Sequence, residues 1–152
     1  MKQKDLLQFN CLRTVAVDYA KRFIGTPYRW AGDDPMAGFD CSGFVVEVLQ
    51  AVGKLQMHDY SANDLYALFK LDAVASGYMG CLAFWLDGAG RAVHVMILVD
   101  DVHVIGALGG GSTTISVEDA IKQNAFIKMR PLNYRKGTPV IVDPFKEMMS
   151  LW

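Results

Sequence analysis

The chain has 152 residues, of which 52% are hydrophobic and 20% are charged. This length suits one domain with its own core and is short for two. A formal net charge of −1, without any run of Lys or Arg, predicts no nucleic-acid partner.

The first predicted helix covers about residues 9–24, where apolar side chains recur at helical spacing. The segment that follows contains three glycines and two prolines before Asp40 and cannot continue a helix. A second helix is expected to begin after Asp40, a good N-cap residue, and to end at Gly53. Its inward stripe consists of Cys41, Phe44, Val45, Val48, Leu49 and Val52.

Cys41 lies in the first turn of that second helix. A free cysteine is often simply buried, and burial is the plain alternative for it. The free N–H groups and the helix dipole at this position favour a thiolate. We therefore expect a lowered pKa for Cys41, which should alkylate before Cys11 and Cys81 at pH 7. The latter two fit buried, structural positions.

The remaining elements change in character along the chain. Ser61 and Ser116 each open a capping pattern, which predicts a helix after each of them. Strands are expected at 81–86, 92–99, 102–108 and 125–132. Helices followed by strands indicate an α+β domain, with an antiparallel sheet packed on the helix that carries the candidate thiol.

A thiol nucleophile needs a base, which a histidine could supply. His94 lies in the most apolar predicted strand, where an imidazole is costly to bury without a partner. Packing of the sheet on the helix start would bring His94 against Cys41, and imidazole is the usual activator of such a thiol. A core histidine bonded to a backbone carbonyl is the alternative for His94, whereas His58 lies in a polar loop and is expected to be solvated.

Three cysteines without CxxC spacing argue against a disulfide framework and a structural zinc site. We expect no cofactor and no metal. The longest apolar stretch, VHVMILV, is far too short for a membrane span, and MKQKDLLQFN has charges where a signal peptide needs its apolar core. Synthesis in the cytoplasm, without a signal peptide, is the expectation.

Two stretches resemble a known family. GTPYRWAGDDPMAGFDCSGFVVEVL closely resembles the nucleophile segment of NlpC/P60 cysteine peptidases, and GCLAFW followed by HVMILV resembles two strands of that family in the same order. The likeness covers most of residues 9–107. It implies a papain-like NlpC/P60 fold, with N-terminal helices on an antiparallel sheet, and a single catalytic domain over residues 1–152. It also implies hydrolysis of the γ-D-glutamyl–diamino acid bond in peptidoglycan stem peptides.

The resemblance assigns roles to particular residues. It implies Cys41 as nucleophile and His94 as general base. It also implies that Asp40 and Ser42 grip the amine of the substrate peptide, and that Tyr28 lies on the oxyanion side. Simpler roles stay open for these three: an N-cap alone for Asp40, a polar residue of the first turn for Ser42, and a packing aromatic for Tyr28.

Three positions depart from the family pattern. Cys81 replaces an aspartate and touches no proposed chemistry. Met96 replaces a glycine on the same strand face as His94, where its bulk is expected to narrow the cleft. Gly106 stands where the family places a third polar residue to orient the histidine. We therefore expect a dyad, slower than its relatives, with His94 oriented by a backbone carbonyl, a water or a side chain from a distant segment.

His103 is not expected to orient His94. With a two-residue loop at Asp100–Asp101, it would share a face with His94 but lie roughly 13 Å away, four residues at about 3.3 Å each. With a three-residue loop it would pair with Val99 and turn to the opposite face. Neither register gives a hydrogen bond between the two imidazoles.

The glycine run GALGGGST follows a strand and precedes a helix, as a phosphate-binding loop does. No Gly-Lys-Ser/Thr follows it, and no dinucleotide fingerprint fits it. We expect it to form a flexible rim of the cleft or a wide turn before Ser116.

These observations predict a single-domain thiol hydrolase of cell-wall peptides, acylated on Cys41 and deacylated by water. The lack of a signal peptide and of wall-binding modules points to a phage-encoded or phage-derived enzyme, associated with phage tail proteins in the virion or released at lysis. One alternative is a non-catalytic structural or peptide-binding module of a phage particle that retains the fold. Another is thiol chemistry on a different acyl substrate.

Overall fold

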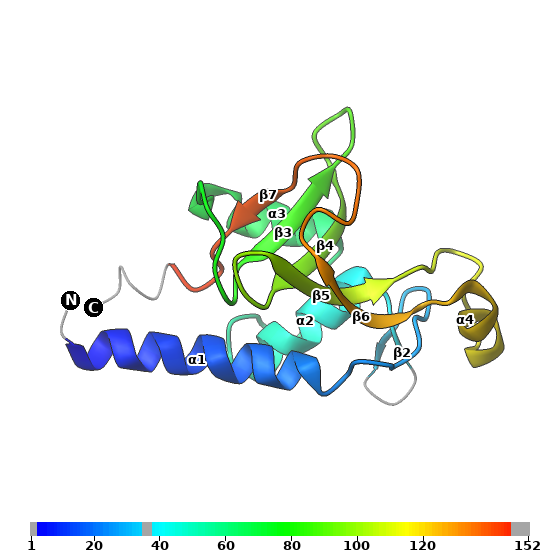
Figure 1. The fold of residues 1–152 in the computed structure, drawn as a ribbon, viewed down its shortest axis with the longest axis horizontal. Coiled ribbons are helices and arrows are strands. Elements are labelled where there is room, and N and C mark those ends of the chain that lie inside the picture. Colours follow the sequence, from blue (N-terminus) through cyan, green and yellow to red (C-terminus); the bar gives the residue numbers. More distant parts are fainter. Residues whose placement is uncertain (1–2, 35–37, 147–152) are drawn as a thin grey trace.

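The computed structural model describes residues 3–34 and 38–146. Its helices are α1 (Gln3–Lys21), α2 (Cys41–Ala51), α3 (Ala62–Phe69) and α4 (Val117–Gln123), with a 3-10 turn, η1 (Lys70–Asp72). Its strands are β1 (Asp33–Asp34), β2 (Gly38–Phe39), β3 (Leu82–Leu86), β4 (Ala92–Leu98), β5 (His103–Leu108), β6 (Phe126–Pro131) and β7 (Val140–Val142). Figure 1 shows α1 along one side of the molecule, with α2 between α1 and the sheet.

The main sheet has the strand order β6-β5-β4-β3-β7, and every neighbouring pair is antiparallel. The expected α+β architecture is therefore confirmed. The short hairpin β1–β2 and the edge strand β7 were not predicted, because two or three residues are too few to show a periodic pattern.

Helix α1 does not match its predicted bounds of about 9–24. It begins earlier and ends at Lys21, after which the chain continues in turns that lead to Gly25, with φ 91°, and Pro27. A residue with positive φ ends a helix, and the following proline prevents its resumption. The last predicted turn is thus part of the connection toward α2.

The hydrophobic core fills both faces of the sheet. On one face the apolar stripe of α2 packs against β4 and β5, and Phe44, Val45 and Val48 are fully buried there. A second cluster covers the other face and includes Trp85, Met96 and Leu98. Because α2 is held along its buried stripe, its first residue has a fixed place against the sheet.

A buried ion pair joins α1 to the segment after β7. The Arg13 guanidinium donates two hydrogen bonds to the Asp143 carboxylate, at 2.8 and 2.7 Å. The Tyr78 hydroxyl donates a third at 2.6 Å. Burial alone would raise the pKa of Asp143, but these donors outweigh it and the pKa is lowered.

We expect Arg13→Ala to reduce the free energy of unfolding by about 3–5 kcal/mol, because it leaves the Asp143 carboxylate buried without its cation. Urea unfolding at pH 7 measures the change. Arg22→Ala, which removes an exposed arginine just beyond the end of the same helix, is the control and should cost under about 0.5 kcal/mol. A loss of similar size in both variants would contradict this account of the pair.

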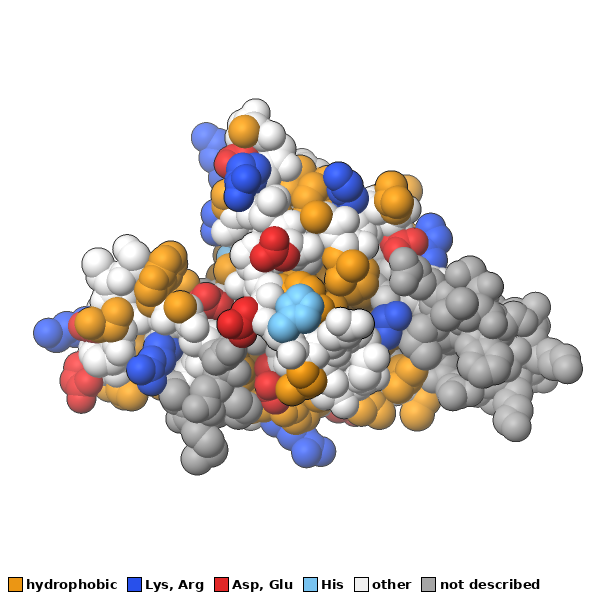
Figure 2. Space-filling view, turned by 180° about the vertical axis from the view of Figure 1, so that it is seen from behind, with side chains coloured by type: hydrophobic (Ala, Val, Ile, Leu, Met, Phe, Trp, Pro, Cys, Tyr) orange, Lys and Arg blue, Asp and Glu red, His pale blue; other side chains and the backbone are white. Residues whose placement is uncertain are grey.

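Among the described residues, no helix has both the length and the apolar character needed to cross a lipid bilayer. On the face turned away in Figure 1, Lys and Arg side chains lie scattered and interspersed with Asp and Glu (Figure 2). Of the cysteines, Cys81 is buried as expected, but Cys11 is exposed because its position on α1 faces outward.

Candidate functional site

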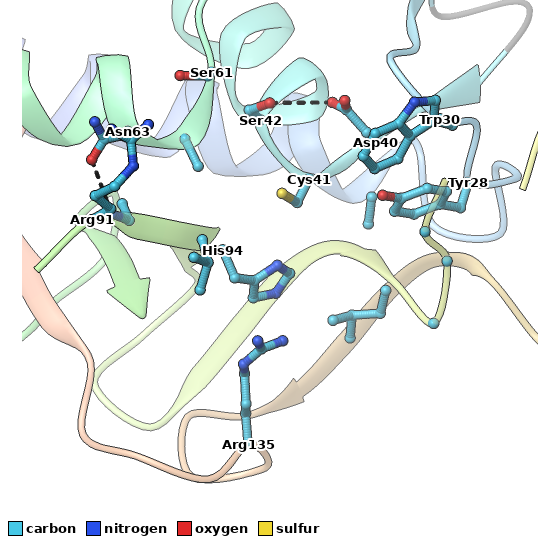
Figure 3. A pocket seen from close by; sticks show the side chains of 18 residues that line it. Tyr28, Trp30, Asp40, Cys41, Ser42, Ser61, Asn63, Arg91, His94 and Arg135 are labelled. Atoms are coloured by element: carbon cyan, nitrogen blue, oxygen red, sulfur yellow. Dashed lines mark hydrogen bonds between the residues drawn. The ribbon is translucent and has the colours of Figure 1, made fainter. Parts of the chain in front are cut away.

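A cleft of about 500 Å³ opens where the start of α2 meets β4 and the end of β5. Its wall includes Tyr28, Trp30, Asp40, Cys41, Ser42, Asn63, Arg91, His94 and Arg135 (Figure 3). All five residues predicted from the sequence to form a site are among these. The fold thus brings together, in one cavity, side chains from the loop before β1, the start of α2 and strand β4.

The start of α2 fixes the candidate thiol. Asp40 is the N-cap, as predicted, and its carboxylate accepts hydrogen bonds from the Gly43 N–H at 2.7 Å and the Ser42 hydroxyl at 3.3 Å. A Cβ on Gly43 would lie 1.9 Å from the Gly32 carbonyl oxygen. Only glycine therefore allows the loop to pack so closely on the first turn, which sets Cys41 at the cleft floor.

The expected lowering of the Cys41 pKa is wrong. Burial raises the pKa of this thiol to about 11 and the Asp40 carboxylate adds to the rise, while backbone N–H groups, that of Val95 included, only partly oppose it. Desolvation raises the pKa of Cys41 more than the N–H groups at the helix start lower it. The prediction that Cys41 alkylates before Cys11 and Cys81 therefore loses its basis, since Cys11 is exposed.

His94 is also uncharged at neutral pH. Its side chain is buried, with only 6% of the residue exposed. Burial, followed by the nearby positive charge of Arg135, lowers the pKa of His94 to about 4. A neutral thiol and a neutral imidazole thus line the same cleft, which suits proton transfer from Cys41 to His94 during attack rather than a preformed ion pair.

Two aromatic residues, Trp85 and Tyr134, contact the His94 ring. Its Nε2 lies 2.9 Å from the Tyr134 hydroxyl oxygen. The Trp85 ring packs against both, with centroids 5.4 Å from His94 and 5.7 Å from Tyr134. Among the three expected sources of a partner for His94, the structure supplies the side chain from a distant segment. No motif marked Tyr134, which lies in the loop between β6 and β7.

His103 lies away from this site, as predicted. The three-residue register holds, because Leu98 pairs with Val104 and the Val99 N–H donates to the His103 carbonyl at 2.9 Å. The His103 Nδ1 lies 2.9 Å from a carboxylate oxygen of Asp100 on the partly exposed turn. His58 is likewise in an exposed loop, as expected.

Met96 does not narrow the cleft. It is fully buried in the second core cluster and is absent from the cleft wall. Its side chain lies over Gly106, where an added Cβ would be 3.1 Å from the Met96 Cγ. The methionine therefore occupies space beside the position that would otherwise carry a third polar side chain.

Tyr28 lies beside Cys41 with its hydroxyl directed into the cleft (Figure 3). Burial, with smaller contributions from Cys41 and Asp40, raises the pKa of Tyr28, so the phenol stays protonated and able to donate. Gly110 packs on the ring, because an added Cβ would meet it at 2.2 Å. Residues 109–111 line the cleft, which agrees with the interpretation of the glycine run as its rim.

Two cations in the cleft were not predicted. Arg91 and Arg135 line the side away from Asp40, and Figure 3 shows Arg135 directed toward His94. Arg91 follows a turn, and its neighbour Ala92 donates its N–H to the Asn63 side-chain oxygen at 3.0 Å. One wall of the cleft is thus acidic and the opposite wall is basic.

Comparison with known proteins gives concordant results. The model of the NlpC/P60 family matches residues 25–131. Murein DD-endopeptidase MepH of Escherichia coli (strain K12) is 35% identical over 88 residues, covering 56% of this chain and 32% of the relative. Probable peptidoglycan endopeptidase LytE of Bacillus subtilis (strain 168) is 28% identical over 123 residues, covering 79% and 33%. The chain spans about a third of the length of these two relatives.

Solved structures share the fold. The NlpC/p60 domain of peptidoglycan hydrolase SagA superposes with a TM-score of 0.62 at 25% identity, covering 86% of this chain and 97% of that one. Peptidoglycan hydrolase RipB from Mycobacterium tuberculosis superposes with a TM-score of 0.67 at 20% identity, covering 95% and 68%. The papain-like arrangement expected from the sequence is thereby confirmed.

Proposed function

Because this chain belongs to the NlpC/P60 family, we propose that it is a cysteine-type endopeptidase of peptidoglycan stem peptides, with Cys41 as nucleophile and His94 as base. The observation that carries the proposal is the pairing of a thiol at the start of α2 with a buried, uncharged imidazole in one cleft. The names of the matched relatives, which include peptidoglycan endopeptidases, support the same substrate class.

The reaction has two halves. His94 takes the proton of the Cys41 thiol as the sulfur bonds to the carbonyl carbon of the scissile amide. His94 then gives that proton to the leaving amine, the C–N bond breaks, and a thioester remains on Cys41. In the second half His94 takes a proton from water, whose oxygen attacks the thioester, and the sulfur leaves and regains its proton. The Tyr28 hydroxyl donates to the oxyanion in both halves.

The charge distribution of the cleft favours a peptide with an amine at one end. Asp40 and Ser42 lie on the acidic side, next to a smaller cavity of about 250 Å³ that they also line. The opposite side carries Arg91 and Arg135. A γ-linked glutamyl residue keeps its α-carboxylate free, and guanidinium groups bind carboxylates well. We therefore propose the γ-D-glutamyl–diamino acid bond as the one cleaved.

The test uses synthetic stem peptides with a free or an acetylated N-terminal alanine, and mass spectrometry to locate the cut. We expect cleavage after the γ-D-glutamyl residue, and a kcat/KM about tenfold or more higher for the free amine, because a charge-assisted hydrogen bond is lost on acetylation. Faster cleavage of the acetylated peptide would refute the amine site. A cut at another bond would refute the proposed specificity alone.

Asp40→Asn sharpens this test. Asparagine caps helices as well as aspartate does, so α2 should keep its start while the charge is lost. The variant should lower kcat/KM for the free amine and leave the acetylated peptide nearly unaffected. No loss on either peptide would assign Asp40 to the cap alone, and an equal loss on both would also refute its role in binding the amine.

The pH dependence of kcat/KM follows from His94. Only the neutral imidazole can accept the thiol proton, so activity falls as His94 becomes protonated. Because burial lowers its pKa to about 4, we expect the acidic limb of the profile near pH 4 rather than near the ordinary value of about 6.5. Initial rates measured between pH 3.5 and 8 at about 25 °C, with circular dichroism to monitor folding, check this. A limb near 6.5 would contradict it.

The non-catalytic alternative rested on the missing side chain at Gly106. The contact between His94 and Tyr134 weakens that argument, because the imidazole has another partner. Association with phage tail proteins, or release at lysis, stays a prediction from the resemblance.

A further inference from the structure

Strand β5, on one side of β4, gives the His94 imidazole no hydrogen-bonding side chain. The family's third residue would stand at position 106, which is glycine here, and the Met96 side chain packs over that glycine. Even a single Cβ at Gly106 would come within 3.1–3.5 Å of three Met96 atoms. A side chain at position 106 would therefore require Met96 to shift by a few tenths of an ångström, and glycine itself offers His94 no partner.

The Tyr134 hydroxyl is a partner from another direction. It lies 2.9 Å from His94 Nε2, although 40 residues separate the two in the chain. The loop that carries Tyr134 is tied down at its start, where the Leu132 N–H donates to the Val102 carbonyl and the Tyr134 N–H donates to the Pro131 carbonyl. Such anchoring limits the motion of the hydroxyl relative to the sheet.

Trp85 holds the two rings together. It pairs directly with His94 across β3 and β4, and its ring packs edge-on against Tyr134. Burial raises the pKa of Tyr134 to about 12, although the Arg135 guanidinium beside it opposes that rise. The phenol thus stays neutral, with an oxygen that can accept a hydrogen bond.

We propose that Tyr134 is a positioning residue, which accepts a hydrogen bond from His94 Nε2–H and so keeps Nδ1 unprotonated toward Cys41. A neutral imidazole has one N–H and one lone pair, so the partner of one nitrogen decides which nitrogen can act as base. In Figure 3 one ring nitrogen of His94 lies on the Cys41 side and the other on the Arg135 side. The positioning role of Tyr134 rests on the proposed function, whereas the tautomer of His94 can be measured whether or not the chain has that activity.

Two readouts test the role in Tyr134→Phe, which keeps the ring against Trp85 and removes only the hydroxyl. We expect kcat to fall by about 10- to 100-fold with KM changed less than about twofold, because substrate contacts stay. In ¹⁵N-histidine NMR spectra without substrate, His94 should be the Nε2–H tautomer in the wild type and a mixture of tautomers in the variant. His94→Ala assigns the signal.

The matched control is Tyr19→Phe, which removes a hydroxyl that donates to Glu47 at 2.7 Å between α1 and α2. It should alter stability about as much as Tyr134→Phe, without changing kcat or the His94 tautomer. A wild-type His94 with its hydrogen on Nδ1 would overturn the proposal without any variant. A kcat unchanged in Tyr134→Phe would also overturn it. If the wild type cleaves no stem peptide, the proposed function fails. The His94 tautomer seen by NMR still shows whether His94 Nε2–H donates a hydrogen bond to Tyr134.

Discussion

Replacing Cys41 with alanine should lower kcat/KM for a stem peptide by at least roughly 1,000-fold, because Cys41 is the one thiol among the described residues that line the cleft, and unactivated serine hydroxyls there are much weaker nucleophiles. Product formation measured by chromatography and mass spectrometry gives the rate. The variant should stay folded, since Cys41 is only partly buried and its methylene remains.

Cys11→Ala is the matched control for this variant. Cys11 is an exposed thiol on α1, and its removal should leave kcat/KM unchanged. If Cys41→Ala keeps more than a tenth of the activity in a folded protein, the nucleophile has been assigned wrongly.

His94→Ala should lower kcat by about 10²- to 10⁴-fold, which is the range of a general base, whereas His103→Ala should keep most of the activity. Both residues are histidines, so the expected difference in activity comes from where each lies in the fold. His94 is buried beside the cleft, and His103 is bonded to Asp100 on a turn. Steady-state rates at pH 7 separate the two variants.

Two results would count against this assignment. A folded His103→Ala as inactive as His94→Ala would show that His103 takes part in a way that the register does not explain. A folded His94→Ala with near wild-type kcat would remove the base from the mechanism.

Local signals were sufficient to predict where the thiol lies. Asp40 as N-cap and the apolar stripe that begins with Cys41 are determined by neighbours within one or two turns, and both match the structure. The strand that carries His94 was also visible, as a continuous apolar run. These features depend on short-range preferences, which a sequence pattern reports directly.

Properties that arise from tertiary packing were not predictable in the same way. The pKa values of Cys41 and His94 are governed by burial, which the helix start alone does not reveal. The sequence predicted that a backbone carbonyl, a water or a side chain from a distant segment would orient His94, but it did not indicate which of the three. Tyr134 reaches His94, and its position depends on how the chain returns after β6, 40 residues later. A contact of that sequence separation leaves no local pattern.

The location of Tyr134 also bears on how much of the chain must be kept when it is truncated or grafted onto another protein. The family match ends at residue 131, so a chain cut there would keep Cys41 and His94 but lose the phenol. It would also lose β7, leaving β3 as a bare edge, together with Asp143 and its bond to Arg13. Grafting or recombining this segment should therefore include residues 132–146 as well, because Tyr134, the proposed partner of His94, lies beyond the residues that the family model matches.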